Sequence, residues 1–211
     1  MSIVNTFSLQ SNRQIKINFN GGDLSSDAGL LLIKEFAAKI GFTKLIKKKF
    51  KTNDKSVRFH KDHENLLQMI YQVISAYFQD DCTDELTLDP VFHAVLDKES
   101  LASQPTLSRF FNRMDEDTLV QFDDIDKNLR DIIYSIKRPE HMLLDLDSTL
   151  FGTHGKQEGE GFNFHYQAHG YHPLLCYDGL TGDLIKAELR DGTLYCSNGA
   201  DKFMESIFQE Y

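Results

Sequence analysis

The sequence has few cysteines and no long apolar run. Its three cysteines, Cys82, Cys176 and Cys196, are odd in number and widely spaced, so we expect no disulfide framework and a reducing, cytoplasmic environment. The longest apolar run, at residues 30–33, is far too short to cross a bilayer. The first residues lack a basic segment followed by an apolar block, so we expect no secretory signal. With 13 Gly and 4 Pro against 16 Phe and 8 Tyr, the composition excludes collagen-like and fully disordered chains.

The remaining composition is that of a globular protein with an uneven charge. The chain has 211 residues, 41% of them hydrophobic, which suits one large domain or two small ones with a real core. The formal net charge is −9, yet residues 39–61 hold nine Lys and Arg and a single acid, Asp54. Residues 80–99 and 115–126 are acidic. An acidic total does not exclude nucleic-acid binding, because phosphate contacts depend on local basic patches.

Two groups of basic side chains are candidates for contacts with DNA phosphates. The first is the lysine run Lys47, Lys48 and Lys49, for which the alternative is a solvated helix end with lysines near the terminal carbonyls. The second is Arg109 and Arg113, which are four residues apart and would share the outer face of a helix. Helix-turn-helix modules present such side chains to DNA. The alternative for both arginines is an exposed face paired with nearby acids.

The first half of the chain is predicted to be mostly helical. Alternation of Ile15, Ile17 and Phe19 with polar residues predicts one short strand that ends at Gly21-Gly22. Apolar periodicity predicts helices at residues 25–40, 62–78, 84–88, 90–96, from 105 onward, and 117–136. The first of these helices would be capped by Ser25 or Ser26 and stopped by Gly41, with these residues on its buried face: Leu30, Ile33, Phe36, Ala37 and Ile40.

The second half changes from a helical to a strand period after Lys137-Arg138-Pro139, which we take as the domain boundary. Residues 141–150 read as a buried strand, and a Gly-rich connection follows. Two more strands are predicted at residues 173–177 and 184–189, joined by a hairpin loop. A helix is predicted from Gly199 onward. The expected fold class is therefore α+β.

Asp145 and Asp147 are the strongest candidates for chemistry. Residues two apart in a strand project from the same face, so the two carboxylates would point together while Leu144 and Leu146 pack behind them. Neighbouring carboxylates in an apolar strand are costly unless something positive neutralises them. Residues 141–211 are poor in Lys and Arg, so we expect a divalent metal, Mg²⁺ or Mn²⁺, bound by both aspartates. The alternative is a strand end where one aspartate caps a turn and the other is solvated.

This acidic motif is similar to that of the haloacid-dehalogenase-like phosphatases, which carry Asp-x-Asp-x-Thr after an apolar strand. Such a resemblance would make Asp145 the nucleophile and Asp147 the acid/base of a Mg²⁺-dependent phosphatase. That family also requires a later lysine and an acidic pair, and the residues after Thr149 contain no convincing match to them.

A broader resemblance covers nearly the whole chain, and we favour it. The sequence resembles the N-terminal portion of bacterial insertion-sequence transposases of the DDE-domain group 1 type (insertion-sequence family thirteen-eighty). The likeness rests on the following blocks: Gly22-Asp-Leu-Ser-Ser-Asp-Ala-Gly-Leu30, Asp89-Pro-Val-Phe92, Leu101-Ala-Ser-Gln-Pro-Thr-Leu-Ser-Arg-Phe110, Leu144-Asp-Leu-Asp-Ser-Thr-Leu150, Gly155-Lys-Gln-Glu-Gly159, His165-Tyr-Gln-Ala-His-Gly-Tyr-His-Pro173 and Asp178-Gly-Leu-Thr-Gly-Asp183.

The transposase resemblance implies a helical DNA-binding region in residues 1–138 and the start of a ribonuclease H-like DDE catalytic domain in residues 139–211. In that family the first strand carries the first catalytic aspartate; Asp147 matches it best, and Asp145 is the alternative or a supporting ligand. The intact protein would use two Mg²⁺ or Mn²⁺ ions to cut and join DNA at the terminal repeats of the element. No membrane partner is implied, and the sequence leaves a homo-oligomer open.

The same resemblance implies an incomplete active site. The second catalytic aspartate and the glutamate of the family have no counterpart in the 211 residues, so we expect a fragment that is inactive by itself. A non-catalytic DNA-binding remnant is the alternative. His165, His169 and His172 are spaced like zinc ligands, but Gly170 and Pro173 argue against a metal-binding helix, and we expect a structural or DNA-side role for them.

Overall fold

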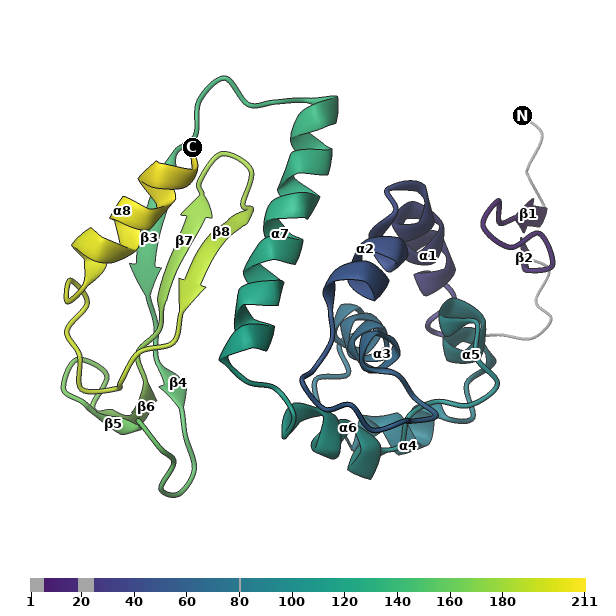
Figure 1. Ribbon diagram of the computed structural model, residues 1–211, viewed down its shortest axis with the longest axis horizontal. Helices are drawn as coiled ribbons and strands as arrows, with labels where there is room; N and C mark the ends of the chain where they lie inside the picture. Colours follow the sequence, from purple (N-terminus) through teal and green to yellow (C-terminus); the bar gives the residue numbers. More distant parts are fainter. Residues whose placement is uncertain (1–5, 19–24, 80) are drawn as a thin grey trace. The chain divides into compact units, whose positions relative to one another are not determined.

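The described residues, 6–18, 25–79 and 81–211 of a computed structural model, combine helices with small antiparallel sheets (Figure 1). The predicted α+β class is therefore confirmed. The chain divides into an N-terminal unit, residues 1–136, and a C-terminal unit, residues 137–211. Within the described part, no helix is both long and apolar enough to span a bilayer.

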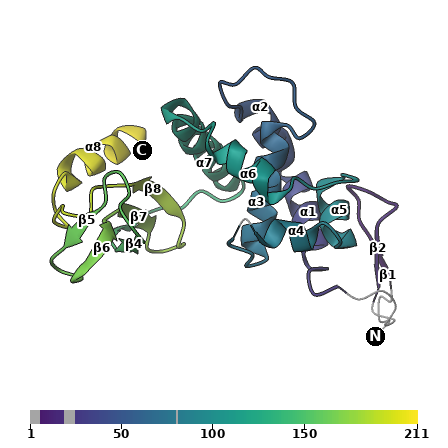
Figure 2. The same cartoon turned by 90° about the horizontal axis from the view of Figure 1, so that it is seen from below.

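The N-terminal unit consists of one hairpin and a group of helices. These elements are β1 (Thr6–Ser8), β2 (Lys16–Asn18), α1 (Leu30–Lys39), α2 (Phe42–Lys49), α3 (Asp62–Ile74), α4 (Cys82–Leu86), α5 (Pro90–Leu96), α6 (Gln104–Phe111) and α7 (Glu116–Ile136). One buried cluster joins side chains of α1, α3 and α5, and a second joins α2, α3, α6 and α7. Helix α3 contributes to both clusters and lies among the other helices in both views (Figures 1 and 2).

Helix α1 differs from its prediction at its start and in its buried face. It begins at Leu30, because the Ser25 hydroxyl accepts the backbone N–H of Asp27 at 3.1 Å and holds a turn that competes with the helix. Leu30 and Ala37 are buried as predicted, but Phe36 is 59% exposed. Gly41 adopts a φ of 77° directly after the helix, which confirms it as the stop.

The short strand predicted at residues 15–19 is confirmed by β2, which pairs with β1. Phe19 and the expected strand end at Gly21-Gly22 lie outside the described residues. Helix α2, which has no counterpart among the predicted helices, ends at Lys49, so the lysine run forms the last turn of a helix.

The C-terminal unit holds two small sheets and one helix. Its elements are β3 (Leu144–Ser148), β4 (Phe151–Gly152), β5 (Gly161–Asn163), β6 (Ala168–Tyr171), β7 (Leu174–Asp178), β8 (Leu184–Glu188) and α8 (Ala200–Glu210). The three predicted strands form one antiparallel sheet in the order β3-β7-β8, and the predicted helix α8 covers one face of it (Figure 1). A second sheet, β4-β6-β5, forms within the segment that the sequence suggested to be a Gly-rich connection.

Candidate functional site

The acidic pair lies on one face of β3. Asp145 and Asp147 are both exposed, whereas Leu144 and Leu146 pack against the buried cluster beneath α8. Strand β3 pairs with β7 so that Leu146 lies opposite the fully buried Cys176. The prediction that both carboxylates project together from a strand is confirmed, because alternate residues of β3 face opposite sides of its sheet.

The exposure of the pair changes the electrostatic argument for a metal. The sequence argument placed both carboxylates in a buried apolar strand, and this was wrong. Helix α8, the helix described in residues 137–211, packs on the opposite face of the sheet and leaves the two carboxylates exposed. Two solvated carboxylates can remain charged without a cation. Burial, and to a lesser degree the charge of Asp145, raise the pKa of the neighbouring Cys176 thiol.

The two carboxylates of Asp145 and Asp147 do not by themselves make up a metal site. Carboxylate oxygens are the donors that Mg²⁺ and Mn²⁺ prefer, so the chemistry of Asp145 and Asp147 fits a divalent ion. Among the described residues, however, no group of three or more His, Cys, Asp and Glu side chains is arranged to hold one. The Asp147 carboxylate accepts the backbone N–H of Ser148 at 2.8 Å, which orients it at the end of the strand.

A tyrosine that the sequence reasoning did not select fixes the surroundings of this strand end. The Tyr166 hydroxyl donates to the carbonyl oxygen of Ser148 at 3.1 Å. The turn that carries Tyr166 is itself held by Asn163, whose side-chain oxygen accepts the backbone N–H groups of His165 and Tyr166. The acidic motif gave no signal for this contact, because Tyr166 lies 18 residues after Ser148 in the sequence.

Two of the three histidines, His165 and His172, pack edge-on against the ring of Tyr166, and His169 lies apart from them with a different partner. His165 packs edge-on against Tyr166, and His169 contacts Glu160 at 2.9 Å. His172 is buried, and its Nδ1 lies 2.8 Å from the carbonyl oxygen of Leu194. These contacts give the three histidines structural roles in the C-terminal unit.

The lysine run divides by its contacts. Lys47 and Lys48 are exposed at the end of α2, while the Lys49 ammonium donates to Asp124 of α7 at 2.6 Å. Lys47 and Lys48 therefore have the accessibility that a phosphate contact requires, and Lys49 serves to join α2 to α7.

The two arginines do not share a helical face. Helix α6 ends at Phe111, and Arg113 turns back to donate to the carbonyl oxygen of Arg109 at 3.0 Å. The Arg113 side chain is only 15% exposed and also donates to Asp62 at 3.1 Å. The expected common outer face was wrong, because the helix stops before Arg113 and its guanidinium closes the helix end instead. Arg109 is exposed.

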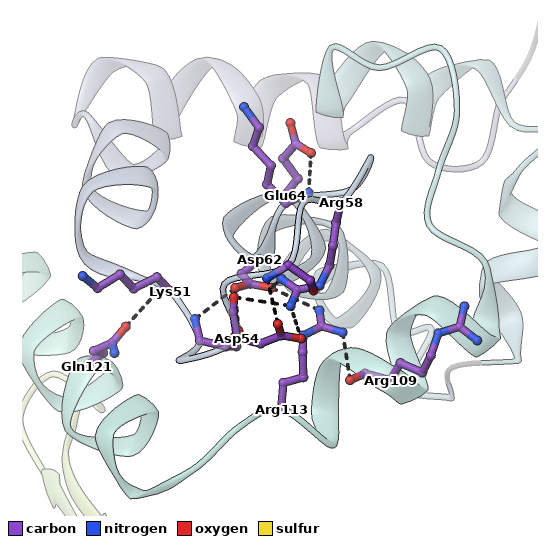
Figure 3. Close-up of polar contacts among 11 residues, drawn as sticks. Lys51, Asp54, Arg58, Asp62, Glu64, Arg109, Arg113 and Gln121 are labelled. Atoms are coloured by element: carbon purple, nitrogen blue, oxygen red, sulfur yellow. Dashed lines mark hydrogen bonds and ion pairs between the residues drawn. The ribbon is translucent and has the colours of Figure 1, made fainter.

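Asp62 is the centre of the polar network around Arg113 (Figure 3). Its Oδ2 accepts the backbone N–H and the hydroxyl of Thr52 at 3.0 and 2.7 Å, and its Oδ1 accepts Arg58 and Arg113. Burial acts to raise the pKa of Asp62, but the hydrogen bonds from Thr52 and Arg113 outweigh it and lower the pKa. The network holds residues 51–61 against α3 and the end of α6.

Comparison with known protein families identifies the family of the chain. Residues 7–211 match the family described as Transposase DDE domain group 1. The chain belongs to this transposase family. No curated protein and no solved structure matches the chain.

Membership of the DDE transposase family relates both the acids of β3 and the exposed cations of the N-terminal unit to one kind of protein. Transposases act on DNA, and DDE domains generally use divalent metal ions. The exposed acids of β3 are suited to the second requirement, and the exposed cations Lys47, Lys48 and Arg109 are suited to the first.

Proposed function

We propose that this chain is part of the transposase of an insertion sequence of family thirteen-eighty. In this proposal residues 1–138 bind the terminal repeats of the element, and residues 139–211 supply the first acidic strand of a ribonuclease H-like catalytic domain. The observation that carries the proposal is the presence of Asp145 and Asp147 on one exposed face of β3, in a chain that matches a DDE family over residues 7–211.

We assign the principal metal contact to Asp147 and a supporting contact to Asp145. A bound Mg²⁺ or Mn²⁺ ion would supply an activated water and stabilise charge on the scissile phosphate. The backbone of β3 holds the two carboxylates on one face, and the Ser148 N–H orients Asp147. Because two carboxylates are fewer than a two-metal site needs, we propose that the 211 residues alone bind metal weakly and do not cleave DNA.

For DNA we assign phosphate contacts to Lys47, Lys48 and Arg109, whose side chains are exposed. Lys49 and Arg113 are engaged with Asp124 and Asp62, so we assign them the role of holding α2 and α6 in place. The terminal-repeat specificity follows from the family and not from a matched base-reading motif.

The proposed acidic site is tested by titrating the chain with Mn²⁺ and following the free ion by electron paramagnetic resonance. We expect weak binding that Asp147→Asn abolishes and Asp145→Asn reduces, because each change removes a charged oxygen ligand. Glu188→Gln is the matched control, since Glu188 is an exposed carboxylate on β8, the other edge strand of the same sheet.

Equal losses in all three variants would show non-specific binding and would remove the acidic site from the proposal. Hydrolysis of a small phosphomonoester, lost in Asp145→Ala, would instead favour a phosphatase.

A further inference from the structure

The loop between α2 and α3, residues 51–61, presents large apolar side chains to solvent. Phe59 is 80% exposed and Val57 is fully exposed. Two exposed lysines, Lys55 and Lys61, flank them in the sequence. Apolar side chains grouped on a surface mark contact sites more often than chance, and this group lies in the most basic stretch of the chain.

The loop is held in place from within. Arg58, at 20% side-chain exposure, forms ion pairs with Asp54 and Asp62, and Asp54 also accepts the backbone N–H of Ser56 at 2.9 Å. Thr52 is buried and bound to Asp62, and the backbone N–H of Lys51 donates to Gln121 of α7 at 2.9 Å (Figure 3). Thr52 and Arg58 therefore point inward and fix the loop, while Val57 and Phe59 point outward.

Lys98 and His60 lie beside Phe59, and the Lys98 ammonium also pairs with the Glu64 carboxylate at 2.7 Å. The Lys98 ammonium lies 5.8 Å from the centre of the Phe59 ring, and the ring of His60 packs edge-on against it with centroids 4.8 Å apart. An exposed aromatic ring flanked in the sequence by exposed lysines matches the composition of surfaces that stack on nucleic-acid bases, where the cations bind the phosphates on either side. Apolar side chains can also enter between base steps of a duplex.

We propose that Phe59, with Val57 beside it, contacts the bases of DNA while Lys55 and Lys61 contact the flanking phosphates. This inference rests on the DNA-binding function proposed above and names the base-contacting element within it. The occupant is DNA and not an apolar protein surface, because the ring lies between the exposed Lys55 and Lys61 in the most basic stretch of the chain.

Phe78 provides a matched control. It is 76% exposed in the same N-terminal unit, but it lies after α3 and lines a hollow that also includes Gln79 and Asp81. A general effect of removing an exposed aromatic ring would appear equally at Phe59 and Phe78.

The chain contains no tryptophan, so single replacements can report on base contact. In the full chain, Phe59→Trp fluorescence should be quenched when a mixed-sequence duplex or its single strand is added, and Phe78→Trp fluorescence should not change. Phe59→Ala should weaken DNA binding in a mobility-shift assay by about tenfold, and Phe78→Ala should leave it unchanged. Circular dichroism checks that each variant is folded.

The outcomes separate this inference from the function on which it rests. Quenching by the duplex indicates insertion between base steps, and quenching by the single strand alone indicates stacking on unpaired bases; both support the inference. DNA binding by the unaltered chain with equal behaviour of the Phe59 and Phe78 variants overturns this inference only. No DNA binding by the unaltered chain overturns both.

Discussion

At the scale of single residues, the Asp62 carboxylate joins segments that are far apart in the sequence through hydrogen bonds. One carboxylate accepts hydrogen bonds from Thr52, Arg58 and Arg113, which lie before α3 and beyond α6. Its side chain is 11% exposed, so water can replace little of this bonding if it is lost. Arg113, which the sequence suggested for DNA, is part of the same arrangement.

We expect Asp62→Asn to destabilise the N-terminal unit by about 2 kcal/mol, because hydrogen bonds to a buried charged group are stronger than neutral ones. The measurement is urea unfolding of the full chain followed by far-ultraviolet circular dichroism. Asp124→Asn is the control: its ion pair with Lys49 is 44% exposed at the aspartate, so water screens it and its loss should destabilise the chain much less. Equal losses in the two variants would contradict a central role for Asp62.

The lowered pKa of Asp62 also predicts a pH dependence. Because its pKa is lower in the folded than in the unfolded chain, the stability that Asp62 contributes is complete above its ordinary value of 3.8. That contribution is lost as the pH falls below 3.8 through the folded-state pKa. Unfolding measured between neutral and acidic pH should therefore show a smaller acid loss in Asp62→Asn than in the unaltered chain. The same acid loss in both would contradict this assignment.

At the scale of elements, close backbone contacts hold the second sheet together. A side chain at Gly192 would place its Cβ 2.0 Å from the carbonyl oxygen of Gly170 and 2.6 Å from that of Gly161. A side chain at Gly170 would meet the carbonyl oxygen of Phe151 at 2.3 Å. Backbone atoms cannot move aside as a side chain can, so these positions require glycine.

Gly192→Ala is expected to destabilise the C-terminal unit by about 1–3 kcal/mol, the usual range for overpacking. Gly152→Ala is the matched control, since Gly152 lies in β4 of the same sheet and its added Cβ would have no atom within 4 Å. Thermal unfolding of both variants gives the comparison. A loss for Gly152→Ala as large as that for Gly192→Ala would show that the close contacts do not matter.

The sequence predicted the elements whose signals are local. Pro90 opens α5, and β3, β7 and β8 follow from their apolar pattern. Strands β4, β5 and β6 could not be predicted, because they are two to four residues long and depend on contacts such as that of Gly170 with Phe151. Short strands carry too few alternations to give a pattern.

The sequence predicted that the two carboxylates of the candidate site point in the same direction, but it did not predict their exposure to solvent. The period of two in a strand places Asp145 and Asp147 together, and this needs no other information. Whether that face is covered depends on what packs against it, which local sequence does not contain. The pairing of Arg109 and Arg113 failed for a related reason: the end of α6 decides which residues share its face.

At the scale of the whole chain, DNA binding must overcome a formal net charge of −9. Phosphate contacts would therefore come from local groups, and their number sets the salt dependence of binding. The proposed division of function assigns those groups to residues 1–138.

We expect replacement of both Lys47 and Lys48 by Ala to lower the slope of log affinity against log salt by about two, one for each lost phosphate contact. The matched control replaces Lys156 and Lys202 by Ala, which changes the net charge equally but lies in the C-terminal unit. The slopes come from mobility shifts with duplex DNA at several salt concentrations. Equal changes in the two double variants would mean that total charge, and not the assigned region, controls binding.

Strand β3 lies at the rim of its sheet, with β7 on one side. A rim strand offers its outward backbone groups to any additional strand that aligns with it. A strand added there would widen the sheet and make β3, with Asp145 and Asp147, an interior strand. Because β3 is an edge strand, a further strand could flank the two acids without any change in β3, β7 or β8.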